Sequence, residues 1–383
     1  MADETARKAD GLSRDEWVKL AQWVRDEYAT RKTNRAEREA LWFEVDRSVA
    51  MKARPWKPEE HMPRWYPAVE PPLQFNALEV IMADVHRMTF PRSGTWFHAS
   101  AAITDEYKLR WDQQRLKRAI IGDVPLEMNL DQETADVLVK QTIEHYHRIY
   151  DFKASISLCD AEALKYGTAV GRVRKVKAAR SAHEYRGQWS DKTIGPKVIP
   201  CALKHTYLDD SWSSLLHEGT IIGPTVIRWI GSQPLDDLKA AMALGGSDAG
   251  YRKVEVDKLV GKEGADGKIG RIELLECEGD VLVPQVTGPG IYLPNCILEV
   301  ACGAGGVDVV RFKKNPMPFR SYVVWHYFKH DIKSAYGDSP LTKGQPVQEI
   351  AAYAVNDFLA ASRLRSLPPI AYDKNDPNIT ASG

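Results

Sequence analysis

The sequence predicts an α+β fold, in which a helical N-terminal region precedes a β-rich region and a long helix follows. Two observations predict this order. Apolar residues recur at helical spacing before residue 166, whereas short strand-like runs separated by Gly/Pro turns fill the middle of the chain. We divide the chain into N-terminal helices with a Pro-rich arm (1–72), a helical part (73–180), a β-rich part (181–336), a long helix (337–366) and a short last segment (367–383).

The composition is that of a globular protein, with 44% hydrophobic and 27% charged residues. The 52 basic residues balance the 52 acidic ones, which argues against a protein whose main task is to grip nucleic acid, because tight binding needs many contacts from Lys and Arg to phosphate. This balance is still compatible with a protein through which DNA passes without being bound tightly. We expect no signal peptide and no membrane helix. Five scattered cysteines predict reduced thiols.

The N-terminal region starts with a capping box, Ser13 and Glu16, followed by helical spacing from Trp17 to Tyr28. A Pro-rich stretch that ends near Leu73 predicts an extended arm. Further helices are expected over residues 34–51, 76–90, 105–120 and 131–165, the last one ending at "YGTAVG".

The middle of the chain is predicted to be a set of short strands with one short helix over 233–244. The strand-like runs are "KVIPCALKHTYLD", "GTIIGPTVIRWIG", "RIELLECEGDVLVPQ", "IYLPNCILEVA", "VDVVRF" and "YVVWHYF". The basic run "RVRKVKAAR" (172–180) is interpreted as a strand with a solvated face, on which Val173 and Val176 point partly inward; contact with phosphate is the alternative.

The segment "GDSPLTKG" resembles a phosphate-binding loop, but the spacing is wrong. A Walker A loop needs glycine just before the lysine and a hydroxyl residue just after it, whereas Thr342 precedes Lys343 and Gly344 follows it. We therefore expect no ATP site and no cofactor.

Metal and nuclease chemistry have only weak candidates. His326 and His330 could share a metal on a helix, but their β-branched and aromatic surroundings predict a strand, which would place the two rings ~13 Å apart. Asp236 and Asp237 suit the first turn of a helix. A second pair, Asp209 and Asp210, lies where a strand meets a turn; a metal-dependent nuclease using this pair is the alternative function. No catalytic residue is predicted.

The segment after residue 336 predicts a capped helix. Gly337 precedes Ser339, a good N-cap, and Pro340 suits the first helical position. Gly344 and Pro346 predict a weak spot, so that regular helix is expected from near Gln345. Apolar and small residues then share a stripe: Val347, Ile350, Ala354, Phe358 and Ala361, which Ala351 broadens.

Such a surface suits a helix that packs against copies of itself in a ring. The alternative is a helix buried in the core of its own domain. Three basic residues on this helix, Lys343, Arg363 and Arg365, are candidates for facing DNA.

The order of four motifs resembles the portal (head-to-tail connector) proteins of tailed bacteriophages. They are "LQFNALEVIMADVHRMTFP", "CDAEALKYGTAVGRVRK", "IPCALKHTYLDDS" and "YGDSPLTKGQPVQEIAAYAVNDFLAASRLRSLPPIAYD", which cover about a third of the chain. The resemblance implies a ring, commonly of twelve subunits, at one capsid vertex. The terminase motor drives double-stranded DNA through such a ring, which later anchors the adaptor and tail.

In this resemblance, residues up to about Tyr336 form the outer wing, Ser339 to Leu364 form a stem helix, and "LPPIAYDKN" enters the clip. The implied location is the virion, after assembly in the host cytoplasm, with the major capsid protein as a further partner. The family also has a second stem helix and often a crown, for which no residues follow Gly383. Either the sequence represents part of a longer chain, or the last helix is another channel element. A capsid or adaptor protein that does not form the channel is a further alternative.

Overall fold

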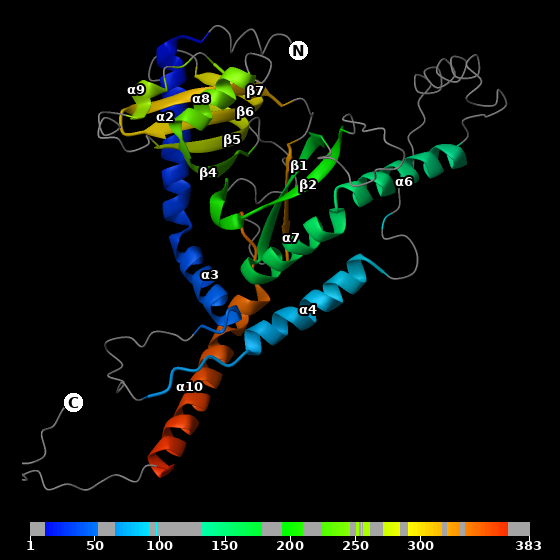
Figure 1. Ribbon diagram of the computed structural model, residues 1–383, viewed down its shortest axis with the longest axis vertical. Coiled ribbons are helices and arrows are strands. Elements are labelled where there is room, and N and C mark those ends of the chain that lie inside the picture. Colours follow the sequence, from blue (N-terminus) through cyan, green and yellow to red (C-terminus); the bar gives the residue numbers. More distant parts are fainter. Residues whose placement is uncertain are drawn as a thin grey trace, which may run out of the picture.

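The computed structural model describes residues 12–52, 66–91, 97, 132–177, 194–209, 224–245, 250–252, 254, 256–260, 271–283, 290–315, 320–329 and 334–366. Within these ranges the fold is mixed α+β, as the sequence predicted, with N-terminal helices, two antiparallel sheets and a long C-terminal helix (Figure 1). The helix expected over 105–120 and the last segment, 367–383, lie outside the described residues.

Helices form most of the first half of the described chain. They are α2 (Arg14–Asn34), α3 (Ala36–Val49), α4 (Leu73–Thr89), α6 (Gln132–Ile149) and α7 (Phe152–Tyr166). The capping box of Ser13 and Glu16 is present at the start of α2, as predicted. The helical region expected over 131–165 is confirmed, but it divides into α6 and α7, because Asp151 adopts a left-handed conformation (φ 48°) between them.

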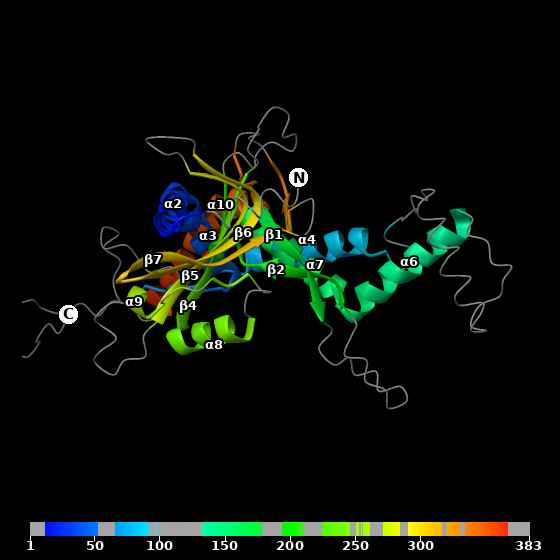
Figure 2. The same ribbon diagram turned by 90° about the horizontal axis from the view of Figure 1, so that it is seen from above.

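A five-stranded antiparallel sheet has the strand order β3-β4-β5-β6-β7. Its strands are β3 (Thr206–Leu208), β4 (Val226–Pro234), β5 (Arg271–Val283), β6 (Ile291–Gly303) and β7 (Gly306–Lys314). Two short helices, α8 (Leu235–Gly245) and α9 (Asp257–Val260), pack on one face of this sheet, and α2 covers the opposite face (Figure 2).

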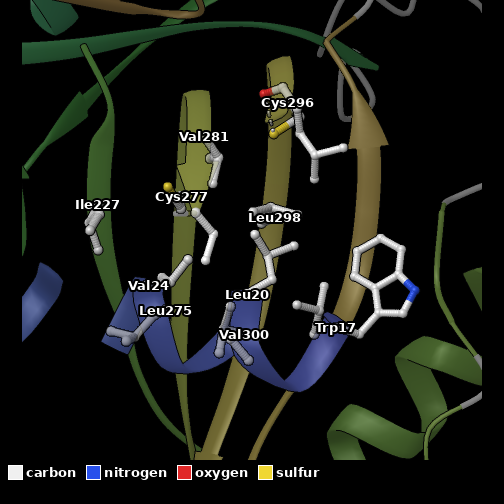
Figure 3. Packing of buried hydrophobic residues seen from close by; sticks show 14 of the residues in the cluster. Trp17, Leu20, Val24, Ile227, Leu275, Cys277, Val281, Cys296, Leu298 and Val300 are labelled. Atoms are coloured by element: carbon white, nitrogen blue, oxygen red, sulfur yellow. Dashed lines mark hydrogen bonds between the residues drawn. The ribbon is translucent and has the colours of Figure 1, made fainter. Parts of the chain in front are cut away.

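Alternation along the strands creates these two apolar faces. On β5, Leu275 and Cys277 point toward α2, whereas Ile272 and Leu274 belong to the cluster under α8 and α9. Figure 3 shows Leu20 of α2 near Leu298 and Val300 of β6, and Val24 of α2 near Leu275 of β5. All of these side chains are at most 4% exposed, so this sheet has a fully enclosed core within one chain.

A three-stranded antiparallel sheet has the order β2-β1-β8, formed by β2 (Ile194–Cys201), β1 (Thr168–Lys177) and β8 (Tyr322–His326). A 3₁₀ turn, Leu203–His205, leads from β2 into β3 of the larger sheet. The predicted strands and the short helix of the middle region are thus confirmed where the structure describes them.

One prediction for the basic run is wrong. Arg172 of β1 is only 1% exposed, because its guanidinium is ion-paired with Glu276 and lies 3.1 Å from Glu278, both on β5 of the other sheet. Tyr322 also donates a hydrogen bond to Glu276 (2.8 Å). The strand therefore turns its first arginine inward to join the two sheets, while Arg174 is about two-fifths exposed and Val173 is half-buried.

The last element, α10 (Pro340–Ser366), leaves the body of the molecule as a stalk (Figure 1). Only its first part contacts other helices, namely α3, α4 and α7. Of the helices that the structure describes, none combines the length and the apolar character needed to cross a membrane.

Candidate assembly surface on helix α10

The start of α10 is an elbow that joins this helix to α7. The hydroxyl of Ser339 accepts hydrogen bonds from the backbone N–H groups of Leu341 (3.0 Å) and Thr342 (3.3 Å), which confirms the predicted cap. The same hydroxyl donates to the carbonyl of Leu164 in the last turn of α7 (2.6 Å). One side chain therefore caps the start of α10 and satisfies a free carbonyl at the end of α7.

The expected weak spot after the cap is absent. The helix is regular from Pro340, and Pro346 lies inside it. Both Gly344 and Pro346 fall in the first two turns, where Gln345 is buried and anchors the helix through Gln74 (2.8 Å). Tertiary contacts thus outweigh the local cost of proline at this position.

Two glycines make the elbow possible. Gly167 has φ 82°, and a Cβ at this position would lie 2.3 Å from the carbonyl oxygen of Gly337. A Cβ on Gly337 would in turn lie 2.5 Å from the carbonyl oxygen of Gly167. The two backbones approach too closely for any side chain, so the Tyr-Gly pairs at 166–167 and 336–337 hold α7 and α10 in one fixed arrangement.

The face of α10 turned toward the body is polar. It contacts a strap, which we define as residues 66–72 and which is the described end of the predicted Pro-rich arm. Asn356 accepts a hydrogen bond from the backbone N–H of Val69 (2.8 Å) and donates one to the carbonyl of the same residue (3.0 Å). Its side chain thus pairs with the strap as a neighbouring β-strand would.

Gln348 continues this polar contact about two helical turns nearer the start of α10. It is 1% exposed and donates to Glu70 (2.8 Å) and to the carbonyl of Pro71 (2.7 Å). The other carboxylate oxygen of Glu70 accepts from Arg47 of α3 (2.9 Å). The amides of Gln348 and Asn356 are therefore matched to specific groups, which fixes the rotation of the helix about its own axis.

The opposite face of α10 carries the predicted apolar stripe (Val347, Ile350, Ala354, Phe358 and Ala361), and all five residues are exposed. Val347 is 64% exposed, Ile350 69% and Phe358 72%. This face is not buried in the core of the domain, as the alternative prediction required. Ala351, beside the stripe, is half-buried. The helix thus buries three amide side chains together with Leu341 and Ala360, while its apolar stripe is exposed, unlike the stripe of an ordinary surface helix.

The three basic residues predicted to face DNA are exposed and lie near the two ends of α10. Lys343 is close to the elbow, where it lies 3.4 Å from Asp338 and over the ring of Phe328. Arg363 and Arg365 lie in the last turn of α10, where positive charge favours the helix dipole.

Electrostatics at the base of the elbow are dominated by Asp46 and Glu162. Burial opposes ionisation of Asp46, but hydrogen bonds from Lys204 (2.5 Å), Tyr166 (2.8 Å) and Lys165 (3.1 Å) outweigh it and lower the pKa of this carboxyl. Glu162 of α7 has a buried oxygen without a hydrogen-bond partner. Its burial, together with the charge of Asp46, raises the pKa of Glu162 to about 7.

The candidates for metal and nuclease chemistry have structural roles where they are described. Asp209 accepts from Arg31 of α2 (3.1 Å), and Asp236 and Asp237 lie in the first turn of α8, as predicted. His326 lies on a strand, as predicted, and burial lowers its pKa to about 4. Asp210 and His330 lie outside the described residues. Within the described ranges, no group of three or more His, Cys, Asp or Glu side chains is placed to hold a metal ion.

Sequence reasoning missed the polar inner face of α10. Gln345, Gln348 and Asn356 recur at intervals of three and eight residues, which places them on one side of the helix. The helical pattern did not mark these amides as buried, because the apolar residues Leu341 and Ala360 lie on the same side of the helix. Neither the profiles of known protein families nor the curated protein sequences include a match to this chain.

Proposed function

We propose that the chain is a subunit of a portal-type ring, a structural channel at a capsid vertex through which double-stranded DNA is packaged and ejected. In this proposal about twelve copies close a ring, α10 is the stem helix, and the two sheets form the outer wing. The terminase motor, the adaptor and tail proteins and the major capsid protein are the expected partners in the virion. The chain itself has no catalytic role.

The observation that carries the proposal is the exposed apolar stripe of α10. Three of its side chains are more than three-fifths exposed on a helix that extends beyond the rest of the described fold. Contiguous apolar surface of this kind marks an interaction site, because leaving it in water costs about 25 cal/mol per Å². A ring of identical helices would cover it on every subunit.

The inner face of the helix supports the same role. The contacts of Gln348 and Asn356 with the strap fix how far α10 is rotated, and the interlocked glycines fix where it points. A subunit of a closed ring needs both properties, since a small error in helix direction would accumulate around the ring.

The mass of the particle in solution tests the proposal. We expect native mass spectrometry and negative-stain microscopy of the full chain to show a closed ring of about twelve subunits. A stable monomer at micromolar concentration would contradict the proposal.

A substitution on the stripe tests the part played by α10. Ala354→Trp places a large ring on the exposed face, so we expect it to prevent ring formation while the circular dichroism spectrum of the protomer stays unchanged. The matched control is Ala240→Trp, at an exposed alanine of α8, which should assemble normally. Normal assembly of the Ala354 variant would exclude α10 as the ring contact.

A further inference from the structure

We infer that the apolar stripe of α10 docks head-to-tail into a groove on the opposite side of the same helix in the next copy of the chain. The groove lies between the strap and α10. It is lined by Ala68, Val69 and Glu70 of the strap, by Glu349, Ala352, Tyr353 and Asn356 of α10, and by Arg47 of α3. This inference rests on the proposed ring and specifies which surfaces meet in it.

Symmetry requires two different surfaces. A stripe that packed against the same stripe of a second copy would close a two-fold dimer and leave no surface for a third copy. A ring of more than two subunits needs each copy to present one surface to the neighbour on one side and another surface to the neighbour on the other side. The groove is a hollow that borders α10 away from its stripe, and it can serve as the second surface.

The angle between the two surfaces fits a large ring. With about 100° between successive residues of an α-helix, the centre of the stripe and the centre of the four groove residues on α10 are about 150° apart around the axis. A regular ring of about twelve helices requires each helix to meet its two neighbours about 150° apart, whereas a dimer or trimer requires much smaller angles.

The heights of the two surfaces also agree. Copies in a closed ring are related by rotation without translation along the axis, so contacting residues must lie at similar heights. The groove residues of α10 fall within 349–356, and the stripe spans 347–361. At about 1.5 Å per residue, the middle of the stripe therefore lies within about a turn of the middle of the groove.

Charge complementarity favours the same pairing. The stripe contains no acidic residue and lies between Lys343 and Arg365. In the groove, Glu70 and Arg47 are paired with each other, so that the carboxylate of Glu349 gives the lining one net negative charge.

Cross-linking of engineered thiols tests the inference. Ala354→Cys places a thiol on the stripe and Ala68→Cys places one beside the groove, both at exposed alanines, in a Cys302→Ser background that removes the most accessible native thiol. After treatment of the full chain with a short bismaleimide, we expect the double variant to give a ladder of linked multiples on a denaturing gel. Each single variant should give no ladder, and a mixture of the two should give linked dimers only.

The outcomes separate this inference from the ring itself. If the particle mass shows a ring but the double variant gives no ladder, the docking inference is overturned and the proposed function stands. Dimers formed by the Ala354→Cys variant alone would indicate stripe-to-stripe packing and would also overturn it. If the particle is a monomer, the proposed function fails, and the docking inference fails with it.

Discussion

The five-stranded sheet and helix α10 bury opposite kinds of side chain. Under α2 the sheet encloses apolar residues such as Leu298, which is 0% exposed, and leaves its charged residues at the edges or in ion pairs. The inner face of α10 buries Gln348 and Asn356, whereas Phe358 is 72% exposed on the outer face. In the sheet, apolar side chains are thus covered by residues of the same chain, whereas on the helix they remain exposed to water.

The difference indicates what each region needs in order to be stable. The sheet completes its core with residues of its own chain, so it does not depend on other subunits. Helix α10 is held to its own chain by specific hydrogen bonds, which contribute modest net stability but fix geometry well. Its apolar face becomes stable only when another surface covers it. Substitutions in the two regions should therefore have different consequences for the protomer and for the assembly.

The largest expected effect on the protomer comes from the sheet. Leu298→Ala removes a fully buried side chain from the centre of the core in Figure 3, so we expect the free energy of unfolding to fall by about 2–5 kcal/mol. Phe358→Ala is the comparison on α10, and we expect it to change this free energy by about 0.5 kcal/mol or less while weakening the ring. Urea unfolding at concentrations low enough for separate protomers, together with particle mass, measures both. A large loss of protomer stability in the Phe358 variant would contradict the expected difference between the sheet and α10.

A smaller effect is expected at the polar face of α10. Gln348→Leu keeps the bulk of the side chain but leaves the carbonyl of Pro71 and one oxygen of Glu70 without their buried donor, which should cost about 1–3 kcal/mol. Val347→Ala, at the adjacent exposed position, is the matched control, with an expected change of about 0.5 kcal/mol or less. Hydrogen exchange of the strap and α10, measured at concentrations low enough for separate protomers, should rise in the Gln348 variant only. Equal stability and equal hydrogen exchange in the two variants would show that the hydrogen bonds of the inner face do not hold α10 to the rest of the chain.

Much of the fold followed from local patterns in the sequence. The capping box at Ser13, the strand-like run of β5 and the Ser-Pro start of α10 each depend on neighbours in the chain, and each was predicted. The errors arose where contacts with residues far away in the sequence determine the structure. Arg172 was expected in solvent because its neighbours are basic, whereas its partners Glu276 and Glu278 lie about a hundred residues further along the chain.

The same limit applies to the candidate site. The stripe of α10 was predicted from helical spacing, but spacing alone could not decide whether the chain covers it. Gln348 and Asn356 gave no sign of a role, since a buried amide differs from an exposed one only in its partners, and these belong to the strap nearly three hundred residues earlier. The close approach of Gly167 and Gly337 could not be predicted either, because each glycine by itself is typical of an ordinary turn.

An effect of no more than similar size depends on pH and concerns Glu162, at the base of the elbow. Burial raises the pKa of Glu162 to about 7 in the folded chain, from a model-peptide value of 4.5. The folded state therefore binds this proton more tightly than the unfolded state does, so the contribution of Glu162 to stability is present below pH 4.5 and is lost as the pH rises through about 7. Because the group is partly exposed, we expect the loss to be about 1–3 kcal/mol at most.

Replacing this carboxyl by an amide should remove the pH dependence. Glu162→Gln cannot ionise, so we expect the variant to be more stable than the wild type at pH 8 by about 1–3 kcal/mol, and the difference to shrink toward pH 4.5. The control is Glu79→Gln, at an exposed position of α4, which should not alter the pH profile. Urea unfolding at both pH values measures the two differences. An equal difference at both pH values would show that the substitution acts through packing at the elbow and not through the charge of Glu162.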